Sequence, residues 1–204
     1  LQGSYTLSES KGNYEGTVLS DNNQADAGST VLYDFVGLTD YQYGLLPNHH
    51  AHQFKVFGSY ALTDNLSFGA NASVISPKHQ GCLGRHPTDG NSGGYGAASR
   101  WCKTFDDTGK LLAPSAPVPR GSAQKTDWQT TLDLSVRYTV PDQIVPLGGN
   151  LVLRADVFNV FNSDAITSRE ERRETGGGGY SANYHKPIAY QEPRYVRVGF
   201  DLNF

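Results

Sequence analysis

The sequence predicts an all-β fold in which antiparallel strands follow one another along the chain as a meander. Six segments alternate between apolar and polar residues, which is the pattern of strands with two different faces. Charged residues inside these segments fall on the polar phase, and the connections between segments are alternately long and short. These three observations are typical of transmembrane strands from an outer-membrane barrel.

The composition agrees with this fold class. The chain has 204 residues, enough for one domain, and its 23 Gly and 12 Tyr favour strands and turns over helices. No apolar run is long enough for a transmembrane helix, which needs about 20 residues, whereas a barrel strand needs only about 10. The net charge of −3 does not favour nucleic acid as a partner.

The first half of the chain contains three of the alternating segments. One phase of residues 1–8 consists of Leu1, Gly3, Tyr5 and Leu7. Residues 9–51 have no sustained period and are expected to form a long outer loop. One phase of residues 52–62 consists of Phe54, Val56, Gly58, Tyr60 and Leu62. After the tight turn Thr63-Asp64-Asn65, one phase of residues 66–75 consists of Leu66, Phe68, Ala70, Ala72 and Val74.

The second half contains the other three segments. A second long outer loop is expected over 76–126, which is rich in Gly and Pro. One phase of 127–140 consists of Trp128, Thr130, Leu132, Leu134, Val136, Tyr138 and Val140. After a short connection at 141–149, one phase of 150–161 consists of Leu151, Leu153, Ala155 and Val157. A third long outer loop, 162–192, precedes the strand 194–204, whose apolar phase is Val196, Val198, Phe200, Leu202 and Phe204.

The charged residues follow the same alternation. Those on the polar phase of their strands are Lys55, Asp133, Arg137, Arg154, Asp156, Arg197 and Asp201. A lipid-facing Lys or Arg near the middle of the membrane costs about 2–4 kcal/mol, which explains why such residues are excluded from the apolar phase. The alternation therefore indicates strands that contact hydrocarbon on one side and water on the other.

Three aromatic residues on the apolar phase are expected at the membrane interfaces: Tyr60, Trp128 and Tyr138. Trp128 and Tyr138 are separated along one strand by roughly 26 Å of membrane height, close to the apolar band of such barrels. A soluble β-sandwich is the alternative, because its strands also alternate. Connections as long as the three seen here are uncommon in a sandwich.

Six strands are too few to close a membrane barrel, since the smallest has about 8. Lipid also leaves the polar groups of a bare strand edge unsatisfied. The chain is therefore part of a larger barrel, or its loops contain two further strands. The absence of Met and a first residue that already lies within a strand favour the first alternative, a gene fragment or a processed product.

The end of the chain resembles the signal by which outer-membrane barrels are recognised for insertion. The residues that carry this resemblance are Arg197, Gly199, Leu202 and Phe204. The resemblance implies that the barrel-assembly machinery binds the C-terminal strand.

Longer stretches resemble the closing strands of TonB-dependent outer-membrane receptors of the Oar-like subgroup. They are residues 4–16, 53–60, 151–162 and 190–200. The resemblance implies the C-terminal part of a barrel of about 22 strands. It further implies a location in the outer membrane of a Gram-negative cell, contact with lipid, and uptake of a bulky nutrient. The inner-membrane TonB complex would act through an N-terminal plug that this chain lacks, and the extracellular ligand remains unidentified.

Cys82 and Cys102 are expected to form a loop disulfide, since a metal or redox pair usually shows closer CxxC spacing. Closing a loop of this size contributes about 3 kcal/mol. His49, His50 and His52 fit a solvated rim better than a metal site, because no carboxylate or Cys partner has suitable spacing. Residues 106–109 resemble a turn more than a calcium loop. The charged run 169–174 is expected to be an exposed loop face, and Gly176 to Gly179 a flexible segment.

Four aromatic residues of the long loops are candidates for ligand contact: Tyr95, Trp101, Tyr180 and Tyr184. Their rings could stack on a sugar or a siderophore, and packing within the loops is the alternative role. Nothing marks a nucleophile elbow or a catalytic triad, so the sequence predicts neither an enzyme nor a bound cofactor or metal. Two other functions stay open: a small self-contained outer-membrane barrel acting as an adhesin or structural protein, and a soluble β-sandwich enzyme.

Overall fold

The described part of the chain is almost entirely β-structure. The computed structural model describes residues 1–22, 24, 26, 28, 30–141, 143, 145 and 149–203. Within these ranges the only helices are short 3-10 turns, and no helix is long and apolar enough to span a membrane. The prediction of an all-β antiparallel fold is confirmed.

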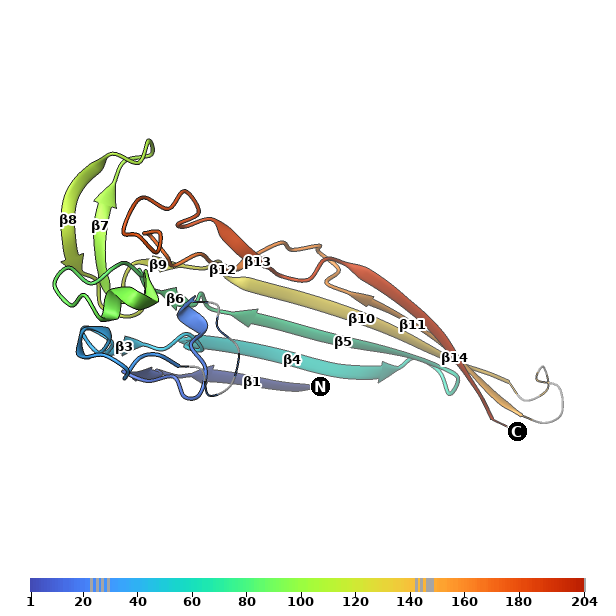
Figure 1. The fold of residues 1–204 in the computed structure, drawn as a ribbon. Coiled ribbons are helices and arrows are strands. Elements are labelled where there is room, and N and C mark those ends of the chain that lie inside the picture. Colours follow the sequence, from blue (N-terminus) through green and yellow to red (C-terminus); the bar gives the residue numbers. More distant parts are fainter. Residues whose placement is uncertain are drawn as a thin grey trace.

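Six long strands form one antiparallel sheet in the order β1-β4-β5-β10-β11-β14. They are β1 (Gln2–Leu7), β4 (His52–Ala61), β5 (Leu66–Ile75), β10 (Gln129–Val140), β11 (Asn150–Phe158) and β14 (Tyr195–Asn203). Each strand pairs with its neighbours in chain order, so the sheet is a simple meander. Figure 1 shows the strands side by side, with the long connections at one end and the short ones at the other.

The strand register places each phase of the sequence on a common face. One row across the sheet consists of Gly58, Ala70, Leu134, Val157 and Val196. The next row consists of Ser59, Gly69, Ser135, Asp156 and Arg197. Because successive side chains of a strand point to opposite faces, the first row belongs to what we call the apolar face and the second to the polar face.

One strand is shorter than the sequence predicted. β11 ends at Phe158, whereas alternation suggested a strand to residue 161. Asn159 has a positive φ of 48°, and Asn162 follows with 51°, so the backbone leaves the extended conformation here. The backbone N–H of Asn159 donates a hydrogen bond of 2.9 Å to the Asp133 carboxylate of β10, which fixes the turn.

The three long connections are more ordered than the sequence predicted. Together, the described residues of 8–51, 76–128 and 159–194 form what we call the loop cap. Its strand pairs are β2 (Lys11–Gly12) with β3 (Gly44–Leu45), β6 (His79–Gln80) with β9 (Gln124–Lys125), β7 (Trp101–Phe105) with β8 (Leu111–Pro117), and β12 (Ile166–Arg169) with β13 (Pro187–Tyr190). Its 3-10 helices in the described ranges are η1 (Ser20–Asn22), η2 (Val36–Leu38) and η3 (Ser92–Tyr95).

The buried apolar side chains lie mainly in the loop cap. Those of the cap are Leu19, Leu32, Leu38, Cys82, Leu83, Ala97, Ala98, Cys102 and Ala165. Val140, Val145 and Val152 are buried near the opposite end of the sheet. The middle of the sheet therefore has no core in the part of the chain that the structure describes, which is the reverse of a soluble sandwich.

Candidate functional site

The apolar face of the sheet is exposed along its length. On the edge strand β14, Val198 is 76% exposed, Phe200 69% and Leu202 40%. The same face carries exposed Phe54, Phe68 and Leu153 on other strands. Soluble proteins expose apolar residues singly, whereas a continuous apolar face marks a surface that contacts a partner or a membrane.

The polar face carries cross-strand ion pairs. The Arg197 guanidinium lies 2.9 Å from the Asp156 carboxylate, and the Arg154 guanidinium lies 2.7 Å from that of Asp201. Asp133 accepts a hydrogen bond from the Asn71 side chain at 3.3 Å. These side chains are partly exposed, so each ion pair contributes little to stability and the face as a whole suits contact with water.

The aromatic residues predicted for the membrane interfaces occupy the two ends of the apolar face. Tyr60 and Tyr138 lie on the same face near the short connections, where Tyr60 pairs with Phe68. Trp128 lies at the end that carries the loop cap and is half exposed. Whether these rings contact a membrane interface stays a prediction.

Sequence reasoning missed a chain of stacked rings that begins at Trp128. The His52 ring stacks on Trp128 with centroids 6.4 Å apart, and the Tyr5 ring stacks on His52 with centroids 6.2 Å apart. The Tyr5 hydroxyl and His52 Nδ1 share a hydrogen bond of 2.9 Å. Tyr5 lies on the apolar phase of residues 1–8, so the sequence could have placed it on the same face as Trp128. The stacking itself depends on the strand register, which the sequence does not give.

The residues of the predicted insertion signal divide between the faces of β14. Arg197 and Gly199 lie on the polar face, and Leu202 lies on the apolar face. Phe204 lies outside the described residues. Recognition of this strand by an assembly machinery stays a prediction.

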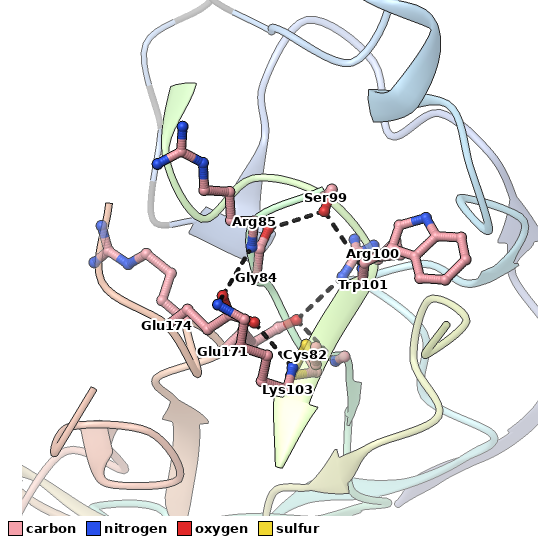
Figure 2. The surroundings of a disulfide bond; sticks show 12 residues. Cys82, Gly84, Arg85, Ser99, Arg100, Trp101, Lys103, Glu171 and Glu174 are labelled. Atoms are coloured by element: carbon pink, nitrogen blue, oxygen red, sulfur yellow. Dashed lines mark hydrogen bonds and ion pairs between the residues drawn. A yellow bond between two sulfur atoms is a disulfide. The ribbon is translucent and has the colours of Figure 1, made fainter. Parts of the chain in front are cut away.

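A disulfide joins Cys82 to Cys102 inside the loop cap, with their Cα atoms 6.4 Å apart. Both residues are buried, and Figure 2 shows Glu174 beside them, directed toward the backbone of Arg85 and Lys103. Glu174 accepts hydrogen bonds from the amides of Lys103 at 2.9 Å and Arg85 at 3.4 Å. The disulfide thereby closes a loop within the second long connection, and Glu174 joins the third connection to it.

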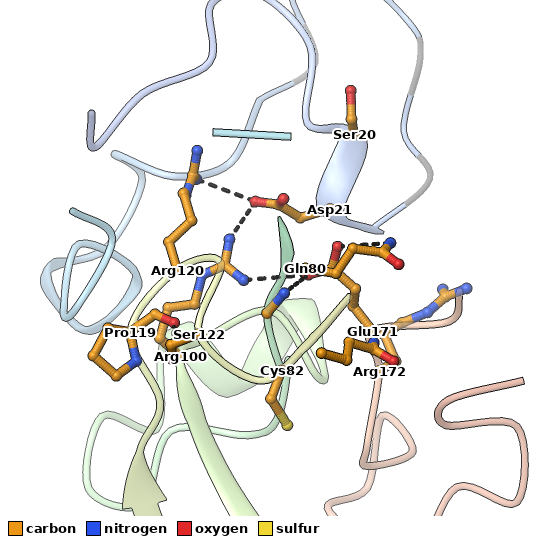
Figure 3. Close-up of polar contacts among 12 residues, drawn as sticks. Ser20, Asp21, Gln80, Cys82, Arg100, Pro119, Arg120, Ser122, Glu171 and Arg172 are labelled. Atoms are coloured by element: carbon orange, nitrogen blue, oxygen red, sulfur yellow. Dashed lines mark hydrogen bonds and ion pairs between the residues drawn. The ribbon is translucent and has the colours of Figure 1, made fainter. Parts of the chain in front are cut away.

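A buried charge cluster joins all three long connections. Asp21 comes from the first, Arg100 and Arg120 from the second, and Glu171 from the third. Figure 3 shows Asp21 between the two guanidinium groups, and Arg120 lies 3.2 Å from it. Arg100 forms ion pairs with Asp21 and, at 3.6 Å, with Glu171. Gln42 accepts hydrogen bonds from both arginines, at 3.2 and 2.8 Å.

Glu171 has a strongly shifted acidity. Burial, followed by the nearby Asp21 charge, raises the pKa of its carboxyl to about 8, although Arg100 and the Gly81 amide act in the opposite direction. The Gly81 amide donates to Glu171 at 2.7 Å, and the Gln80 side chain donates at 3.2 Å. The expectation that 169–174 is an exposed loop face is wrong for its glutamates, because Glu170, Glu171 and Glu174 are buried.

The four candidate ligand-contact aromatics do not gather at one place. Trp101 donates its Nε1 hydrogen to Asp40 at 3.3 Å and packs against Tyr41 and His86. Tyr180 contacts the Phe105 ring. Tyr184 contacts the His185 ring and lies beneath the Arg173 guanidinium. For these three the loop contacts favour a packing role.

Tyr95 differs, because its ring is exposed and its hydroxyl donates a hydrogen bond to Asp34 at 2.6 Å. No group of three or more His, Cys, Asp or Glu side chains in the described ranges is arranged to hold a metal ion. His49, His50 and His52 instead bond separately to Ser10, Ser76 and Tyr5.

Comparison with known proteins gives one informative similarity. The chain is 28% identical over 240 residues to the TonB-dependent transporter Oar of Myxococcus xanthus. The alignment covers 100% of this chain and 20% of that protein, so the chain spans about a fifth of this relative's length. No family model and no solved structure matches the chain. The resemblance to Oar-like TonB-dependent receptors, predicted from the strand sequences, is confirmed.

Proposed function

We propose that this chain forms barrel wall and extracellular loops of a TonB-dependent outer-membrane transporter that takes up a bulky nutrient. The observation that carries the proposal is the distribution of buried residues: the sheet leaves its apolar face uncovered, whereas the loop cap has a core. Hydrocarbon covers such a face without a second protein layer. The similarity to Oar supports the same assignment.

The topology supports a wall segment of a larger barrel. β1 and β14 are the outer strands of the sheet in the described part of the chain and pair with one neighbour each. A strand edge in lipid must pair with another strand, since nothing else there satisfies its backbone groups. We infer that further strands, which the 20% coverage of Oar leaves room for, close the barrel around this sheet.

The partners follow from this location. Lipid of the outer membrane covers the apolar face, and the barrel-assembly machinery binds β14 during insertion. The TonB complex acts through a plug outside this chain. The loop cap faces the outside of the cell, where it meets the ligand before uptake.

Thiol labelling of the intact transporter tests the orientation of the sheet. Both native cysteines are in the disulfide, so a single introduced cysteine is the reactive thiol of the described chain. We expect Val198→Cys to react with a lipid-soluble maleimide and to resist a charged, water-soluble one. Gly199→Cys, one residue along β14 and on the opposite face, is the matched control and should show the reverse preference. Equal labelling of both sites by the charged reagent would refute a lipid-facing sheet.

The two other functions fit the structure less well. A self-contained adhesin barrel requires closure, whereas β1 and β14 remain unpaired with each other. A soluble sandwich requires a second sheet over the apolar face, and within the described residues the other sheets have two strands each and belong to the loop cap.

A further inference from the structure

A polar hollow of about 320 Å³ lies in the loop cap, where the second long connection meets the third. One wall is formed by Tyr95 and the backbone that follows it, and the other includes Glu170, Arg172, Ser181 and Asn183. Its volume is near the lower limit of small-molecule sites, which run from about 300 to 1,000 Å³. The hollow therefore has room for a small molecule or for one part of a longer one.

The charges around the hollow are already compensated. Both carboxylate oxygens of Glu170 accept hydrogen bonds from the Arg172 side chain, at 2.9 and 3.0 Å. Glu174 accepts from the Lys103 amide and lies 3.6 Å from the Lys103 ammonium. Each of these charges therefore already has an opposite partner, so the hollow favours a neutral ligand over a charged one.

The ligand must also be polar. Apart from the Tyr95 ring, the apolar side chains of the wall are the methyl groups of Ala97 and Ala98, which offer little surface to a lipid. Ser181 and Asn183 supply a hydroxyl and an amide, each able to donate and accept hydrogen bonds. An extended peptide usually binds along a free strand edge, and this wall consists of a 3-10 turn and side chains.

Tyr95 supplies a flat apolar surface that is held in place. Its ring is 45% exposed, its hydroxyl is bonded to Asp34, and its ring centroid lies 5.8 Å from that of Phe35. The bond to Asp34 raises the pKa of the Tyr95 hydroxyl, which keeps it neutral. Exposed Phe35 extends the aromatic surface beyond the hollow.

We propose that this hollow binds one end of a neutral oligosaccharide, with a sugar ring stacked on Tyr95 and its hydroxyl groups bonded to Ser181, Asn183 and Arg172. A sugar ring combines a flat C–H face with many hydroxyl groups, and this combination matches a fixed aromatic ring beside polar side chains whose charges are paired. The rest of the oligosaccharide extends over Phe35. This inference rests on the proposed function, because it names the ligand class that the outward-facing cap contacts.

Calorimetric titration of the intact transporter in detergent with malto-, cello- and laminari-oligosaccharides tests the site. We expect one of these series to bind, Tyr95→Ala to weaken the binding about tenfold, and Asn183→Ala to weaken it by a similar factor. Tyr95→Phe keeps the ring and should retain binding within about threefold. Tyr43→Ala is the control, because Tyr43 is an exposed tyrosine of the cap that does not line the hollow.

Two results would overturn the inference: none of the three neutral series binds, or binding occurs and is unchanged in Tyr95→Ala and Asn183→Ala. Binding of a charged siderophore or a peptide at these residues would also overturn it. The thiol labelling of β14 separates this failure from failure of the proposed function. If Val198→Cys labels from lipid and no neutral oligosaccharide binds, the barrel assignment stands and the ligand class is wrong.

Discussion

Single residues of the charge cluster decide how firmly the three long connections hold together. Asp21, Arg100 and Glu171 are buried and come from different connections. A buried ion is stable only while its partner compensates it, so Asp21 and Arg100 depend on each other, whereas burial favours the neutral form of the Glu171 carboxyl. Ion pairs on the polar face of the sheet are partly exposed and have no such dependence.

Acidity should change the stability of the loop cap through Glu171. The folded cap raises the pKa of Glu171 from 4.5 to about 8, so folding favours the neutral carboxyl. This contribution is fully present below pH 4.5 and is lost as the pH rises toward about 8, by at most about 1.4 kcal/mol per pH unit. Urea unfolding followed by Trp101 fluorescence in a Trp128→Phe background measures it. Glu171→Gln should flatten this slope, and the exposed Glu9→Gln should keep it; an equal slope in both variants would contradict the assignment.

Removing the central cation should destabilise the cap. Arg100→Met leaves Asp21 without its closest cation, and we expect a loss of about 3–5 kcal/mol in the same urea experiment. Lys11→Met, which removes the exposed partner of Glu9 within the cap, is the matched control and should leave the midpoint unchanged. A small effect of Arg100→Met would mean that the cluster does not hold the cap together.

At the scale of elements, the strand pair β7–β8 depends on the disulfide more than the main sheet does. Cys102 lies in β7, and Cys82 lies 20 residues earlier, beyond β6. The main sheet is stabilised separately by long antiparallel pairings such as β4 with β5 and β5 with β10. Loss of the disulfide should therefore loosen one part of the molecule and leave the other intact.

Hydrogen exchange tests this difference. In Cys82→Ser/Cys102→Ser, the unfolded chain has more conformational entropy because the cross-link is gone, and this destabilises the folded cap by about 3 kcal/mol. Amides of β7 and β8 should exchange faster than in the native chain, and amides of β4 and β5 should be unchanged. Faster exchange in β4 and β5 as well would show that the cap and the sheet unfold together.

At the scale of the whole molecule, strand positions were predictable and the cap was not. Alternation is a local property with a period of two residues, so it located the six strands and their faces. Arg100 and Asp21 are 79 residues apart, and Gln80 and Glu171 are 91 apart, so no local pattern relates them. The charged run 169–174 was predicted to be solvent-exposed, because the residues that bury Glu171 and Glu174 lie on other connections and are not visible in the local sequence. Of the four candidate ligand-contact aromatics, only Tyr95 borders the hollow. Its hydrogen bond to Asp34 joins two different connections, so no local pattern predicted it.

Gel mobility tests whether this sheet closes without further strands. We expect the isolated chain in detergent to migrate equally with and without heating, because an open six-stranded sheet lacks a heat-resistant closed form. The intact transporter should migrate faster before heating than after it. A heat-dependent shift of the isolated chain would favour the self-contained barrel.

The uncovered apolar face has a consequence for how this chain accepts mutation. In the proposed orientation, liquid hydrocarbon covers Val198 and Phe200 and adapts its shape to any side chain, so exchanges among Val, Ile, Leu and Phe at these positions should leave no void. Leu32 and Leu38 are fixed by protein neighbours, and trimming either one opens an empty space that nothing fills. During evolution, the strands of the sheet should therefore exchange one apolar residue for another freely on this face, while the buried residues of the loop cap should change little.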